Sequence, residues 1–272
     1  FLVVESVRIQ RFSLFPFDFF RRVPVSDKFG QASLLCLSLG VFFASLVILN
    51  NEYLHLVSYQ KLTIEVFFLG YSFPVSLITM AIMFSFMTKR ESRLVTVLKE
   101  IGFWSVNLGV IVFFVFIIFE LTILTMVAAT TLFFAVWMIF FLFLATAPKV
   151  QQKTFLVSGM IFLLFTALTG IFYILPYFYP SLDPYRHPSL VLHAMVSLYG
   201  WNLSGMFIII RWSDFPIQLN SALAITLHWC IVLVLAPLGK YILPVSILAM
   251  VAYVALLCVV FAGNAHSKEA IG

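Results

Sequence analysis

Two histidines lie inside long apolar runs of the sequence, where an ionisable side chain is costly and therefore usually serves a function. His193 is expected about one turn inside one membrane helix, and His228 lies nine residues before Pro237, at the end of the next. Adjacent antiparallel helices would point both imidazoles into one space. The pair therefore predicts a b-type haem between two imidazoles or a small metal centre, with hydrogen-bonded packing and a proton or substrate path as alternatives.

Further polar residues are expected near this pair. A metal centre would be completed by Glu65 or His187, while Trp201 and Asn202 could donate hydrogen bonds to haem propionates or to a quinone. Gly200 would leave room for the flat edge of a cofactor. The predicted cofactor-binding residues are thus His193, His228, Trp201, Asn202 and Gly200, and the predicted metal ligands are His193, His228, Glu65 and His187.

One predicted helix face carries small and polar residues at the spacing i, i+4, i+7 and i+11. Its members are His193, Ser197, Gly200 and Ser204. Such a face packs closely against a neighbouring helix or against a cofactor. The sequence contains no P-loop, HExxH, GxSxG or GxGD motif and no clustered histidine boxes. A non-catalytic or electron-transfer role is therefore favoured over that of an enzyme.

The composition indicates that these helices lie in a membrane. Of the 272 residues, 63% are apolar and 10% are charged, and the mean hydropathy is +1.10, whereas a soluble domain needs far more polar surface. The apolar runs approach the ~20 residues that a helix needs to cross hydrocarbon. The net charge of +5 does not indicate binding of nucleic acid, because the positive residues flank the apolar runs. The sequence predicts an all-α, multi-pass transmembrane helical bundle that contacts the lipid bilayer.

About eight spans can be assigned, with a tight hairpin at Glu120, where the apolar stretch is too long for one helix. Residues 1–31 are basic and aromatic, which suits the membrane surface, and residues 263–272 form a short cytoplasmic tail. The predicted spans are 32–50, 62–87, 101–119, 122–146, 154–175, 189–210, 218–237 and 242–262.

The positive residues fall mainly on one side of these spans. Of the 16 lysines and arginines, only Lys61, Arg186 and Lys240 are assigned to the other side. The positive-inside rule then predicts that both termini are cytoplasmic and that the chain lies in the plasma membrane. Spans 62–87 and 189–210 also share a pattern of small residues, which predicts two four-helix halves, with chance agreement as the alternative.

A short stretch, 192–206, resembles a span of the catalytic subunit of cbb3-type haem-copper oxidases and of haem-bearing membrane proteins of the NnrS type. That span has a histidine, then a Gly-Trp pair and a Gly-Met pair. Here these residues are His193, Gly200, Trp201, Gly205 and Met206. Met195 stands where those proteins have a second histidine, and no three further histidines cluster for a copper. The resemblance therefore implies a degenerate or accessory relative that holds haem, without an oxygen-reducing centre.

Three functions are compatible with these patterns. The leading hypothesis is a membrane subunit or accessory protein of a respiratory or other redox complex, which holds haem b or faces a quinone near the outer leaflet. The second is a proton-coupled transporter of a small molecule or ion, with a path formed by Glu65, Glu120, His193 and His228. The third is a purely structural subunit that packs against other membrane subunits.

Overall fold

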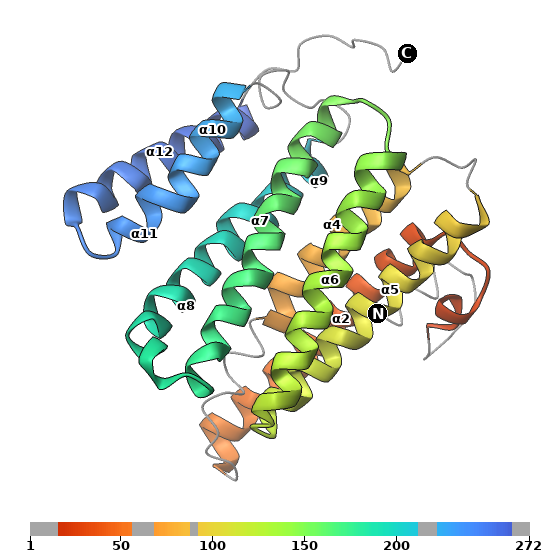
Figure 1. Ribbon diagram of the computed structural model, residues 1–272, viewed down its shortest axis with the longest axis horizontal. Helices are drawn as coiled ribbons and strands as arrows, with labels where there is room; N and C mark the ends of the chain where they lie inside the picture. The colour runs from red at the N-terminus through yellow and green to blue at the C-terminus, as the bar shows by residue number, and fades with distance from the viewer. Residues whose placement is uncertain (1–15, 56–67, 88–91, 212–221, 263–272) are drawn as a thin grey trace. The chain divides into compact units, whose positions relative to one another are not determined.

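The computed structural model describes residues 16–55, 68–87, 92–211 and 222–262 of the chain. Within these ranges the chain is almost entirely helical and contains no strand (Figure 1). It divides into two compact units, Phe1–Ser85 and Phe86–Gly272, which are described separately below.

Seven helical segments are long and apolar enough to cross a membrane, and the shorter apolar helix Gly70–Phe86 brings the number in the described ranges to eight. The prediction of an all-α polytopic bundle with about eight spans is therefore confirmed. The seven segments are Val25–Leu54, Arg93–Ile118, Thr122–Thr146, Gln151–Tyr177, Pro180–Ile210, Ala222–Gly239 and Leu243–Phe261.

The first unit begins with a short helix, η1 (Phe17–Phe20), followed by the long helix α2 (Val25–Leu49). The sequence placed residues 1–31 at the membrane surface and began the first span at 32, but α2 starts seven residues earlier. Its first turn follows Pro24, a residue that suits the start of a helix because it has no N–H to leave unpaired. Lys28 is buried within this early part of α2. A basic residue at this point therefore did not mark a surface segment outside the helix. Residues 1–15 lie outside the described ranges.

Helix α4 (Phe73–Phe86) contacts α2 in this unit. The hydroxyl of Ser33 donates to the carbonyl of Pro74 over 2.7 Å, and the rings of Phe29 and Phe84 have centroids 5.0 Å apart. The π-helical turn η3 (Phe68–Ser72) ends two residues before Pro74, and α4 continues from Phe73. Proline supplies no N–H to the preceding turn, which explains the irregular turn at this point.

The second unit contains three long helices that run back and forth: α5 (Arg93–Ile118), α6 (Thr122–Thr146) and α7 (Gln151–Ile174). They are followed by two further spans that π-helical turns interrupt, and by the last helix. In chain order these later elements are η4 (Leu175–Tyr177), η5 (Pro180–Tyr185), α8 (Arg186–Met195), η6 (Val196–Asn202), α9 (Leu203–Ile210), α10 (Ala222–Cys230), η8 (Ile231–Leu235), α11 (Ala236–Gly239) and α12 (Leu243–Ala262).

The tight hairpin predicted at Glu120 is present between α5 and α6. Glu120 has a positive φ of 56°, the left-handed conformation that reverses the chain in few residues. The helices then pack closely, because a Cβ on Gly102 would lie 3.0 Å from Ile139 and one on Gly109 would lie 2.7 Å from Leu132. Small residues on one face of α5 therefore set its distance to α6.

Several span ends differ from the prediction by up to nine residues. Helix α5 begins at Arg93 instead of 101, because the Ser92 hydroxyl accepts a hydrogen bond from the backbone N–H of Val95 and caps the first turn. The span predicted to start at 189 is helical from Pro180 onward. Pro180 lies in the first turn of η5, where a proline is tolerated, and Pro184 lies within this short 3-10 helix. Positions 62–67 and 218–221 of the predicted spans lie outside the described residues.

The end of α6 is fixed by a lysine from the following helix. The Lys153 ammonium donates to the carbonyl of Leu144 over 2.9 Å and to that of Ala147 over 2.7 Å. The last carbonyls of a helix have no partner within the helix and carry partial negative charge, so a cation is favourable there. Lys153 thus links the C-terminal end of α6 to the start of α7.

We expect Lys153→Gln to lower the stability of the second unit by about 1–2 kcal/mol, because it removes two charge-assisted hydrogen bonds at a helix end. The measurement is thermal unfolding of the purified protein in detergent. Lys149→Gln is the control, since Lys149 is exposed in the same connection and makes no such contact. Equal effects of both substitutions would contradict the capping role.

Candidate functional site

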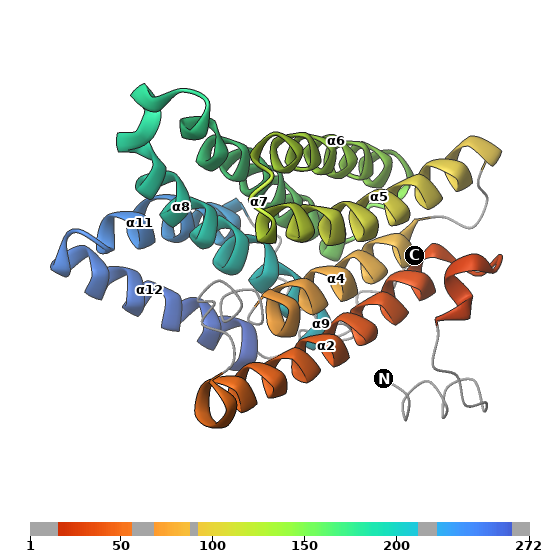
Figure 2. The same cartoon turned by 90° about the horizontal axis from the view of Figure 1, so that it is seen from below.

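Helix α7 lies against the span formed by α8, η6 and α9 over most of its length (Figures 1 and 2). Two glycines allow this approach. A Cβ on Gly159 would lie 2.8 Å from the Cβ of Ser204, and one on Gly200 would lie 2.5 Å from the ring of Phe162. The face of small residues predicted from His193 to Ser204 therefore packs against a neighbouring helix, which was one of the two partners predicted for it.

The middle of this span is the π-helical segment η6, in which the N–H of Leu203 reaches the carbonyl of Leu198. π-helical turns are rare and occur frequently at functional sites. Gly200, Trp201 and Asn202 are all buried in this segment, the last two with 1% of their surface exposed. Three of the predicted cofactor-binding residues thus belong to the packed interior of the second unit.

His228, on α10, is enclosed by aromatic side chains and has no exposed surface. Its ring centroid lies 6.1 Å from that of Phe155, 5.1 Å from that of Phe162 and 6.4 Å from that of Phe207. The neighbouring Trp229 stacks on Phe162 at 4.5 Å. The imidazole therefore occupies the centre of the contact between α7, α9 and α10.

A single hydrogen bond determines the tautomer of His228. Nε2 lies 2.8 Å from the carbonyl oxygen of Tyr199, and because a carbonyl can only accept, Nε2 must carry the proton. In the neutral ring Nδ1 then bears a lone pair, and this atom is buried without a hydrogen-bond partner in the structure. His228 thus joins α10 to the π-helical segment η6.

His193, on α8, is oriented by α7 through its other nitrogen. Nδ1 lies 2.9 Å from the carbonyl oxygen of Thr166 and 3.3 Å from the hydroxyl of Thr169. The carbonyl requires Nδ1 to be the donor, which leaves the lone pair of the neutral ring on Nε2. Gly170 makes room for the imidazole, since a Cβ there would lie 3.3 Å from Cε1 of His193.

The two imidazoles contact α7 at different levels. His228 lies beside Phe155 and Phe162, whereas His193 lies beside Thr166 and Gly170. At 1.5 Å per residue these levels are on the order of 10–15 Å apart, too far for two rings to bind one iron atom. The structure therefore does not bring the two histidines into one space, and a haem held by both does not fit this arrangement.

Of the two remaining predicted ligands, only His187 is among the described residues. Nε2 of His187 lies 3.4 Å from the Lys240 ammonium, and Glu65 falls outside the described residues. Among the residues that the structure describes, no group of three or more His, Cys, Asp or Glu side chains could hold a metal ion. The metal centre and the transporter path both include Glu65 and stay predictions.

Sequence reasoning missed the partners that hold the site residues in place. Thr166 and Thr169 orient His193, and Ser158 accepts a hydrogen bond of 2.8 Å from the indole N–H of Trp229. These residues lie on one face of α7 at helical spacing. That spacing of hydroxyl side chains could have identified them from the sequence. The carbonyl of Tyr199 could not be found in this way, because no side-chain type marks a backbone acceptor.

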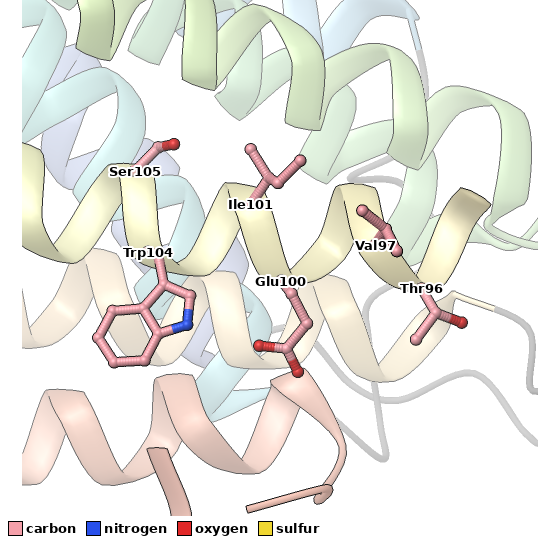
Figure 3. Close-up of a pocket in the computed structure, with 6 residues that line it drawn as sticks. All are labelled: Thr96, Val97, Glu100, Ile101, Trp104 and Ser105. Atoms are coloured by element: carbon pink, nitrogen blue, oxygen red, sulfur yellow. The ribbon is translucent and has the colours of Figure 1, made fainter. Parts of the chain in front are cut away.

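An open hollow of about 440 Å³ lies along α5 and is lined by residues of this helix alone. Figure 3 shows that the side chains of Glu100 and Trp104 lie next to each other on one side of the helix. Because one helix supplies all of its lining, the hollow does not enclose a ligand. Its lining residues are Thr96, Val97, Glu100, Ile101, Trp104 and Ser105.

Comparison of the chain with protein-family models, with curated proteins and with solved structures gives no match. The resemblance of residues 192–206 to haem-bearing oxidase subunits stays a prediction from the sequence.

We expect Gly200→Ala to destabilise the second unit by about 1–3 kcal/mol, because the new methyl group would overlap the buried ring of Phe162. Gly30→Ala is the matched control, since a Cβ on Gly30 would meet nothing within 4 Å and alanine favours the helix. Thermal unfolding in detergent measures both variants. A Gly200→Ala protein as stable as the control would contradict the close packing of η6 on α7.

Proposed function

We propose that this chain is an integral membrane subunit of a respiratory or other redox complex in the plasma membrane, and that His193 faces a quinone. The observation that supports the proposal is the hydrogen bond from Nδ1 of His193 to the Thr166 carbonyl. A backbone carbonyl that holds Nδ1–H is typical of histidines whose Nε2 is a metal ligand, and it leaves the same Nε2 lone pair available to accept a hydrogen bond.

A quinone suits one imidazole better than a haem held by two. The hydroxyl of the reduced quinone would donate to the lone pair on Nε2 of His193, and the apolar surroundings would accept its tail. His193 is half-buried, so its ring is held by protein on one side without being fully enclosed. Electron transfer would then take place between the quinone and a redox centre in a partner subunit.

The experiment measures quinone binding to the purified protein. His193→Leu should weaken binding of a quinone at least tenfold, because leucine has no atom that can accept a hydrogen bond from the quinone. His55→Asn is the control: His55 is exposed in the first unit, and asparagine tolerates its positive φ of 50°. An absorption spectrum of the same sample reports haem directly.

Two outcomes would contradict the quinone proposal. One is equal binding by the native protein and a folded His193→Leu variant. The other is a Soret band that disappears with His193→Leu, which would assign the imidazole to haem iron. Helix content and elution volume show whether the variant has folded.

A purely structural subunit is the second candidate, and the exposed faces of two helices support it. Only 11% of the residues in the most apolar stretch of Arg93–Ile118 are buried, and the same percentage is buried in the most apolar stretch of Leu243–Phe261. Such faces contact lipid or the helices of other subunits.

If the chain belongs to a larger assembly, purification in mild detergent should retain partner subunits in fixed stoichiometry. Native mass spectrometry of the purified material gives the composition directly. Partners together with quinone binding would support the redox subunit, and partners without it would support the structural one. A single chain free of partners would contradict both.

A further inference from the structure

We propose that Lys240, His187 and Arg186 form a binding site for the phosphate group of an anionic phospholipid. All three lie at one end of the second unit, where the turn between α11 and α12 meets the start of α8. This proposal is independent of the quinone, because it uses a different part of the chain.

Arg186 is held in a fixed position by aromatic rings. Its guanidinium carbon lies 4.1 Å from the ring centroid of Tyr177 and 5.3 Å from that of Tyr173. Asp183 forms an ion pair with it at 3.8 Å, and 31% of the arginine side chain is exposed. The guanidinium has five N–H donors, so this one carboxylate contact leaves donors for a further anion.

Lys240 brings a second cation next to His187, the residue that follows Arg186, without a negative partner. Its ammonium lies 3.4 Å from Nε2 of His187, and no carboxylate among the described residues lies within ion-pair distance of it. An ammonium can only donate, so the neutral form of His187 accepts one of its three hydrogens. The remaining hydrogens are available to an acceptor from outside the chain.

The turn that carries Lys240 is closely packed. A Cβ on the preceding residue, Gly239, would lie 2.8 Å from the Cα of Ser246 on α12, which is a backbone atom. The ammonium is therefore presented from a defined turn. With one carboxylate against two permanent cations, the group carries one uncompensated positive charge.

The position along the spans identifies the anion as a lipid headgroup. Tyr177, Tyr185 and Tyr241, close to the three residues in sequence, are 56%, 66% and 63% exposed. Exposed tyrosines at the ends of membrane helices lie at the level of the headgroups. A cation held at this level meets the phosphate groups of lipids, and basic groups between membrane helices bind acidic headgroups.

The test uses the full chain in detergent and native mass spectrometry to count bound lipids. Phosphatidylglycerol should be retained in preference to phosphatidylcholine. Lys240→Gln should weaken phosphatidylglycerol binding about fivefold, whereas Lys240→Arg should preserve it. Lys149→Gln is the matched control, because Lys149 is an exposed lysine in the α6–α7 connection of the same unit.

Three results would overturn the proposal. The first is equal retention of phosphatidylglycerol by native protein and Lys240→Gln. The second is an equal loss with Lys149→Gln, which would indicate a diffuse attraction of charge. The third is complete displacement of the lipid by millimolar inorganic phosphate, which would assign the site to a soluble anion.

Discussion

The second unit depends on how closely α7 approaches the span formed by α8, η6 and α9. Helices in a membrane gain little from hiding apolar surface, since lipid is apolar too, and they associate through close van der Waals packing and hydrogen bonds. Gly159 and Gly200 bring the backbones together, and Phe162 fills the space opposite Gly200. The same phenyl ring contacts His228 and Trp229 on α10. One contact therefore connects three spans.

Polar groups inside the spans find their partners mostly in the backbone. Thr125, Thr130 and Thr146 of α6 each donate to the carbonyl four residues earlier, which satisfies the hydroxyl without any contact to another helix. His193 and His228 differ from these threonines, because each histidine donates to a carbonyl of a neighbouring span and not of its own helix. In hydrocarbon such bonds replace the ones that water would make, and they tie neighbouring helices together.

The sequence predicted the helical class, the number of spans and the hairpin at Glu120, because hydropathy and length depend on local composition. It also predicted that the face from His193 to Ser204 packs closely, since small residues at helical spacing have few other uses. It could not predict that His193 and His228 lie at different levels. That difference arises from the relative shift of α8 and α10 along α7, and side-chain contacts set such shifts. Helix starts were misplaced where Pro24 and Ser92 allowed a span to begin early.

The π-helical segment η6 affects which changes in chain length the span tolerates. A π-helical turn holds one more residue than a regular turn, so removal of one residue from η6 would let the span continue as regular α-helix. Ser204 and Phe207 would then still face Gly159 and Phe155 of α7. The same removal from a regular helix would turn the residues after it by about 100° relative to those before it. A single deletion is therefore tolerated better within η6 than in the regular helix on either side of it.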